Sequence, residues 1–385
     1  MTFVLRSRPA TTPAMIEIFG DETTLHLALR FQAELARAKA AVGVLPDAVA
    51  ARIAMACDTA EIDAAQLAEE AAHAGTLAIP LVARLRAALA GETAAAEAVH
   101  QGATSQDLSD TVLMCQAQRA VGIVLDDLGR IVEALSLLAE RHAQTPAVGR
   151  TLMQDALLIP FGLRVAQWLQ GIERARRRLE HEAATALVVQ LGGPVGARGG
   201  LAGKGGEVSA RMAKALGLGV PLAPWHATRD GIAGLATALG IATGALGKMA
   251  RDVALLAQNS IGELREPYSA GRGSSSAMAH KRNPTGAQIA LSAAVRAPGL
   301  VSAMLSGMPQ EAERGIGGWQ AEAAVLAELF MIAGGAAAAL AAISEELEVD
   351  EVAIADNVAR SGLSDDLGEG AAIIAAILAD ARESR

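Results

Sequence analysis

An apolar residue recurs at every third or fourth position through residues 232–256, and this repeat constrains the fold more than any other stretch. Its steps alternate between three and four over more than three heptads, which predicts a long helix packed nearly parallel to its neighbours in a bundle. Such a helix needs partners on most sides, and one chain supplies few long helices. We therefore expect a homo-oligomeric bundle. The repeat consists of Ile232, Leu235, Leu239, Ala242, Leu246, Met249, Val253 and Leu256.

The rest of the chain also favours helices, because it is 52% hydrophobic but only 2% aromatic, a composition typical of closely packed helices rather than sheets. We predict an all-α fold with a long central helical bundle. Residues 1–105 would form a small N-terminal helical domain, residues 106–345 the bundle with the oligomer contacts and active site, and residues 346–385 a short, truncated C-terminal helical segment. An ordered turn is expected at 149–162. Helical spacing predicts long helices over residues 21–42, 104–143, 161–190, 286–305 and 318–345, and shorter ones over 47–57, 63–74, 81–91 and after 347.

Charge and cysteine content exclude several classes of function. The net charge of −9 argues against non-specific binding of nucleic acid, and an anionic substrate would need a local basic site. Cys57 and Cys115 have no metal-ligand or disulfide spacing, which suits a reducing cytoplasm. We expect no metal, no export signal and no membrane partner, because the uncharged run at 231–247 is Gly/Ala-rich and too short for a convincing span.

A polar loop interrupts the apolar helices at residues 271–284. Its glycines and serines disfavour a helix, while Lys281 and Arg282 add positive charge and Asn283 adds an amide. Pro284 can open the next helix. A loop of hydroxyls and cations between rigid helices is suited to closing over an anionic substrate. The alternative is a connection whose charges only keep it solvated.

A second polar stretch covers residues 100–107. Thr104 and Asp107 have the spacing of a capping box at the start of a long helix. The free backbone N–H groups there, with the hydroxyls of Thr104 and Ser105, could receive a carboxylate. The alternative is that both residues only cap the helix. His100 could bond a substrate or order the loop.

These stretches resemble the fumarase/aspartase superfamily. The loop is similar to its segment G-S-S-x-M-P-x-K-x-N-P and departs from it at Ala279, where the family has proline. Residues 100–110 and 149–156 resemble two further substrate-binding segments. Leu152 stands where the fumarases and the argininosuccinate and adenylosuccinate lyases usually have a histidine. That loss, with similarities at 224–230 and 313–322, marks the branch of the 3-carboxy-cis,cis-muconate cycloisomerases. The loop matches at Gly273, Ser275, Ser276, Met278, Lys281, Asn283 and Pro284.

The resemblance implies an isomerase without a cofactor, acting on a small tricarboxylate in the protocatechuate (β-ketoadipate) pathway. One substrate carboxylate adds to a double bond and closes a lactone, in an intramolecular lyase reaction. A cytoplasmic homotetramer would share its active sites between subunits. Ser275 would exchange the proton, with Lys281 favouring its alkoxide and His100 as a secondary proton group. The residues implied to bind substrate are Thr104, Ser105, Gln154, Arg229, Asn283 and Arg314, with Lys281 also holding a carboxylate.

Two other readings remain open at this point. The first is a lyase that releases fumarate by cleaving a C–N bond, such as adenylosuccinate lyase, although Leu152 argues against it. The second is a helical homologue that has kept the fold and lost activity. Leu152 and Ala279 are consistent with such a loss, whereas the joint presence of the other matching residues argues against it.

Overall fold

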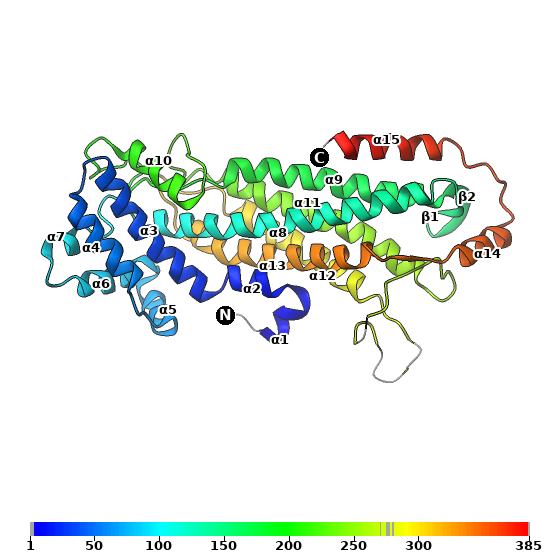
Figure 1. Cartoon of the computed structure of the whole chain (residues 1–385), viewed down its shortest axis with the longest axis horizontal. Coiled ribbons are helices and arrows are strands. Elements are labelled where there is room, and N and C mark those ends of the chain that lie inside the picture. Colours follow the sequence, from blue (N-terminus) through cyan, green and yellow to red (C-terminus); the bar gives the residue numbers. More distant parts are fainter. Residues whose placement is uncertain (1–3, 270, 275–277, 279–280, 384–385) are drawn as a thin grey trace.

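Five long helices lie side by side along the long axis of the molecule and form one bundle (Figure 1). The computed structural model describes residues 4–269, 271–274, 278 and 281–383. The first bundle helix has 37 residues and is therefore about 55 Å long, at about 1.5 Å per residue. The predicted all-α bundle is confirmed. Its helices are α8 (Ser105–Arg141), α9 (Phe161–Ala186), α11 (Asp230–Leu256), α12 (Thr285–Ser306) and α13 (Gly318–Ser344).

The apolar repeat of residues 232–256 occupies α11, and each of its eight residues is at most 5% exposed. α11 packs against α9, α12 and α13 of the same chain. The predicted long helix is confirmed, but our reason for expecting an oligomer was wrong, because one chain already covers the repeat.

α12 is less covered by the rest of the chain than its neighbours in the bundle are. Only 22% of its most apolar stretch is buried, compared with 61% in α11 and 67% in α13. By length and composition alone, these three helices could each span a membrane.

Shorter helices pack at one end of the bundle (Figure 1). α10 comes from the middle of the chain but packs on α3, so two separate stretches of sequence build this end. The helices predicted at residues 21–42, 47–57, 63–74 and 81–91 are confirmed within a few residues. The elements here are α3 (Asp21–Ala41), α4 (Asp47–Asp58), α5 (Ala64–Ala74), α6 (Ala78–Ala88), α7 (Thr93–Ala98) and α10 (Gly205–Leu216); α1 (Val4–Ser7), a 3-10 helix (Arg8–Ala10) and α2 (Pro13–Ile18) precede them.

A β-hairpin stands at the other end, where the sequence predicted only an ordered turn. β1 (Pro146–Thr151) pairs antiparallel with β2 (Gln154–Pro160). Leu152 and Met153 form its two-residue turn with φ of 52° and 66°. Both values lie in the left-handed region that a two-residue hairpin turn requires and that asparagine and glycine usually supply. The turn therefore carries no sequence signal, which explains why the hairpin was missed.

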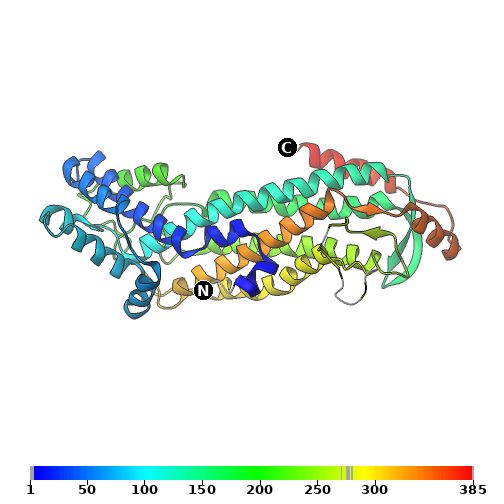
Figure 2. The same cartoon turned by 60° about the horizontal axis from the view of Figure 1, so that its bottom comes forward.

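After α13 the chain adds a short strand and two helices, and the last helix runs back along the bundle. β3 (Leu264–Arg265) pairs antiparallel with β4 (Glu348–Val349), and α14 (Glu351–Ser361) packs against β1. α15 (Gly370–Glu383) then lies against α9 (Figure 2). Short helices after residue 347 were predicted, and they are confirmed.

Candidate active site

The N-terminus of α8 is held by one buried carboxylate. Asp107 accepts the backbone N–H of Thr104 at 2.8 Å, which completes a capping box. Its oxygens also accept the N–H groups of Gly192 at 2.8 Å and Gly193 at 2.9 Å, and His226 Nε2 lies 2.7 Å away. The side chain of Asp107 is fully buried. It therefore fixes three segments around the point where a carboxylate would approach the helix.

Two of the expected substrate-binding residues meet at this helix end. Arg314 lies on the connection between α12 and α13, and its Nη1 donates to the hydroxyl of Thr104. The two residues are 210 positions apart in the sequence. Arg314 is exposed, while Thr104 and Ser105 are half-buried. A guanidinium, the hydroxyl of Thr104 and the positive end of a helix dipole thus converge, which is a favourable arrangement for an anion.

His100 precedes this helix in a strained loop with φ of 63°. Its Nδ1 accepts a hydrogen bond from Gln32 Nε2 at 2.9 Å, which leaves the proton of the neutral ring on Nε2. Burial lowers the pKa of His100 to about 4; Asp107 opposes this, and Arg86 and Lys39 add to it. The imidazole is therefore neutral near pH 7 and is better suited to donating a hydrogen bond than to accepting a proton.

Arg229 was expected to bind substrate, but its side chain is buried among protein groups. Its side chain is 0% exposed, with Asp110 on one side at 2.9 Å and Glu322 on the other at 3.1 Å. The guanidinium also stacks on Trp225, 4.6 Å from the ring centroid. Burial opposes the charge, but the two carboxylates outweigh it and raise the pKa of Arg229. With no exposed surface to offer a substrate, Arg229 joins α8, α11 and α13 instead.

The described residues of the polar loop, 271–274, 278 and 281–284, lie at the other end of the bundle, before the start of α12 (Figure 1). Ser275, to which the resemblance assigned proton transfer, falls outside the described residues. Asn283 donates its backbone N–H to Gly273 O at 2.8 Å, and Lys281 is exposed. The first N–H groups of α12 are already occupied, because Glu266 accepts two of them at 2.9 and 2.8 Å. These two N–H groups of α12 are therefore not free to bind an anion.

Gln154 also lies at this far end, next to the hairpin turn. Its side chain is exposed and donates to Met153 O at 3.1 Å. The hairpin is anchored close to its turn, because Arg150 donates to the fully buried Glu263 at 2.8 Å, as does Asn357. Neither Glu263 nor Asn357 was singled out from the sequence, because no local pattern marks a partner about a hundred residues away.

One chain therefore does not bring the whole predicted site together. His100, Thr104, Ser105 and Arg314 are at the start of α8, whereas Gln154 lies in the hairpin that follows α8, and Lys281 and Asn283 come just before α12. The hairpin is roughly one length of α8, about 55 Å, from the start of that helix. No substrate of a few ångströms can contact both groups in one chain.

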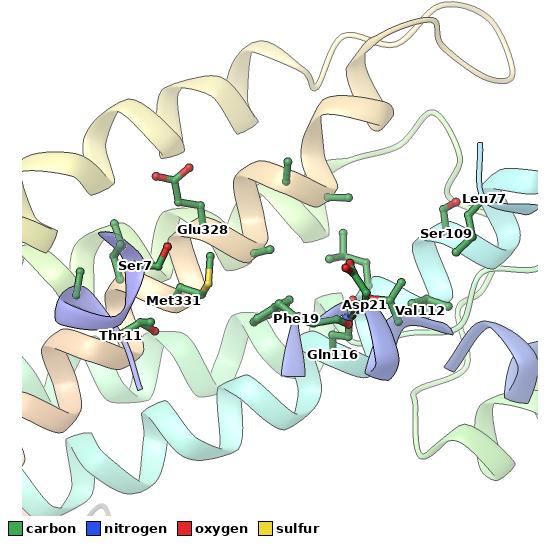
Figure 3. A pocket seen from close by; sticks show the side chains of 18 of the residues that line it. Ser7, Thr11, Phe19, Asp21, Leu77, Ser109, Val112, Gln116, Glu328 and Met331 are labelled. Atoms are coloured by element: carbon green, nitrogen blue, oxygen red, sulfur yellow. Dashed lines mark hydrogen bonds between the residues drawn. The ribbon is translucent and has the colours of Figure 1, made fainter. Parts of the chain in front are cut away.

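A cavity of about 850 Å³ lies beside the first turns of α8 (Figure 3). Its walls are mainly apolar, and its charged residues are Arg6, Asp21, Arg296 and Glu328. These charges balance, and Arg296 is ion-paired with Glu328. A tricarboxylate needs an excess of cations, so this cavity does not suit it.

Comparison with known proteins gives the family. The family described as "Lyase" matches residues 7–299. This chain belongs to that lyase family. It is 44% identical over 337 residues to the 3-carboxy-cis,cis-muconate cycloisomerase of Pseudomonas aeruginosa, covering 87% of this chain and 73% of that protein. It is 42% identical over 349 residues to the enzyme of the same name from Pseudomonas putida, covering 90% and 83%.

A solved structure agrees with the sequence comparison. The chain resembles the crystal structure of the 3-carboxy-cis,cis-muconate lactonizing enzyme from Pseudomonas putida with a TM-score of 0.86 and 38% identity. The match covers 99% of this chain and 88% of that one. The resemblance to the cycloisomerase branch is confirmed, and with it the expectation of an enzyme.

Proposed function

We propose that this lyase-family enzyme interconverts 3-carboxy-cis,cis-muconate and a carboxymuconolactone. One carboxylate of the substrate adds to a double bond and closes the lactone ring, while a proton is delivered beside another carboxylate. The substrate supplies its own nucleophile, so the reaction needs no cofactor. Charge accumulates on a carboxylate in the transition state, and fixed donors that meet this charge supply most of the rate enhancement.

The meeting of Arg314 with Thr104 at the N-terminus of α8 carries this proposal. It supplies a guanidinium, hydroxyls and a helix dipole for one carboxylate, held in place by the buried Asp107. A protein with a net charge of −9 needs such a local basic site to bind a polyanion. The two cycloisomerases at 42–44% identity support the choice of substrate.

The active site is formed by several subunits of a homotetramer in this proposal. His100, Thr104, Ser105 and Arg314 of one subunit would meet the loop and hairpin of others, because a single chain holds them apart. α12 supplies a surface for such contacts. Its Val295 is 75% exposed and its Leu305 is 47% exposed. Exposed apolar side chains on a long helix favour burial against a partner.

The loop and hairpin complete the site in this assembly. Ser275 exchanges the proton, and Lys281 favours its alkoxide while holding a carboxylate together with Asn283. Gln154 binds from the hairpin, where Leu152 is 96% exposed and presents an apolar group. A leucine cannot activate water, so the substrate's own carboxylate meets no competing nucleophile from this residue. Arg229 stays a structural residue.

We place the enzyme in the cytoplasm, in the catabolism of protocatechuate, with no nucleic acid and no membrane as partner. Cys57 and Cys115 are both buried free thiols. Burial raises the pKa of Cys57 to about 12 and that of Cys115 to about 11. Such thiols are unreactive, which suits a reducing compartment.

The absorbance of 3-carboxymuconate in the near ultraviolet tests the function. Its conjugated diene is lost on lactonisation, so the absorbance should fall when enzyme is added. Adenylosuccinate and argininosuccinate serve as the contrasting substrates. Release of fumarate from either at an enzymatic rate, without turnover of the muconate, would replace the cycloisomerase by a C–N lyase. Ser275→Ala should lower turnover by about 10²-fold or more while the fold is kept.

A further inference from the structure

Lys39 is a buried cation that the proposed mechanism does not use. It lies on α3 and is 1% exposed. Its ammonium donates to Gln101 O at 3.1 Å and approaches Ala98 O at 3.4 Å and Gln101 Oε1 at 3.5 Å. Across the part of the chain that the structure describes, no carboxylate forms an ion pair with it. Burying a charge without an opposite charge is costly, so a lysine at this position calls for a functional explanation.

The groups bonded by Lys39 belong to the loop that leads into the α8 N-terminus. This loop joins α7 to α8 and contains two left-handed residues, His100 with φ of 63° and Gly102 with φ of 87°. α3 holds it a second time through Gln32, which donates to His100 Nδ1. Thr104 follows directly, so a shift of the loop would move the carboxylate-binding helix end.

The charge of Lys39 also acts on the site directly. It adds to burial and to Arg86 in lowering the pKa of His100, against the opposing effect of Asp107. A positive charge inside the protein is screened far less than one at the surface. It therefore contributes to the attraction of a polyanion at the adjacent helix end without occupying space there.

We propose that Lys39 is a positioning residue for the reaction: its buried ammonium holds the loop of residues 99–103 in register with α8 and adds positive potential behind the bound carboxylate. The inference rests on the proposed function of this site. It explains why a charge without an ion-pair partner is kept under the loop, where an apolar side chain would be more stable.

The test combines activity with stability in Lys39→Met, which removes the charge and keeps the approximate volume. We expect kcat/KM for the tricarboxylate to fall at least tenfold, mainly through a higher KM, while the urea midpoint of unfolding stays the same or rises. A purely structural lysine would instead show a lower midpoint together with any loss of activity. Lys214→Met removes a lysine exposed on α10 and should leave kcat/KM unchanged. Wild-type kcat/KM in Lys39→Met would overturn the proposal.

A titration of His100 by NMR tests the electrostatic part without any substrate. Its imidazole resonance is assigned by comparison with His100→Gln. Lys39→Met should raise the pKa of His100, because a like charge is removed, and an unchanged pKa would contradict the account. If Lys39→Met does not fold, Lys39→Gln, which keeps an N–H donor but no charge, gives the same comparison. A wild-type enzyme that fails to turn over the tricarboxylate refutes the proposed function alone.

Discussion

Replacing Arg229 by methionine should destabilise the fold severely. The change removes the guanidinium between Asp110 and Glu322, whose side chains are 4% and 2% exposed. Breaking such a buried ion pair costs about 3–5 kcal/mol, because the remaining charge is left uncompensated. A second estimate gives a free-energy cost of the same size. Taking up a proton on one carboxyl at pH 7, about three units above its ordinary pKa, costs about 4 kcal/mol.

Urea denaturation at one fixed protein concentration measures this cost, since oligomerisation makes the midpoint depend on concentration. The loss of stability should be smaller at pH 5, where one of the two carboxyls takes up a proton more easily. Neutralising both carboxyls as well, in Arg229→Met with Asp110→Asn and Glu322→Gln, should restore much of the stability. Arg52→Met breaks the exposed pair with Glu92 and should leave the urea midpoint nearly unchanged. A stable Arg229→Met variant with strongly reduced kcat/KM would refute the reasoning. It would support the original expectation that Arg229 binds the substrate.

Two further predictions concern the start of α8. Asp107→Asn turns an amide N–H₂ toward two of the four donors that the carboxylate now faces, so we expect a loss of about 1–3 kcal/mol in urea denaturation and a lower kcat/KM. His100 has a pKa of about 4 in the folded protein, below its ordinary 6.5. The unfolded chain therefore binds more protons between these values, and stability contributed by neutral His100 is lost as pH falls from about 6.5 to 4. His100→Gln should flatten that part of the stability–pH curve, and an unaltered curve would contradict the pKa.

The long helices could be predicted because their information is local. The repeat of residues 232–256 marks one helix by itself, and the capping pair of Thr104 and Asp107 marks the start of another. The hairpin could not be predicted in this way, because Leu152 and Met153 adopt a turn that their side chains do not favour. The pairing of β1 with β2 imposes that conformation, because Thr151 and Gln154 on either side of the turn are paired.

The candidate site was predictable only in part. The motif around Arg229 suggested a substrate-binding residue, but Arg229 pairs with carboxylates 119 and 93 positions away, and nothing local in the sequence pairs them with it. The same holds for Arg314, whose contact with Thr104 depends on how α13 lies beside α8. The function of Lys39 was equally hidden, since a lysine inside a helix sequence is usually exposed.

Complementation between two inactive variants tests the shared site most directly. Thr104→Val damages the α8 end of the site and Ser275→Ala damages the loop, and each should be inactive as a homo-oligomer. When the two are co-expressed in equal amounts, random assembly gives about a quarter of the sites both intact residues, so about a quarter of wild-type activity should return. If the co-assembled oligomers stay as inactive as the separate variants, the two ends do not meet across subunits and the proposed active site is wrong.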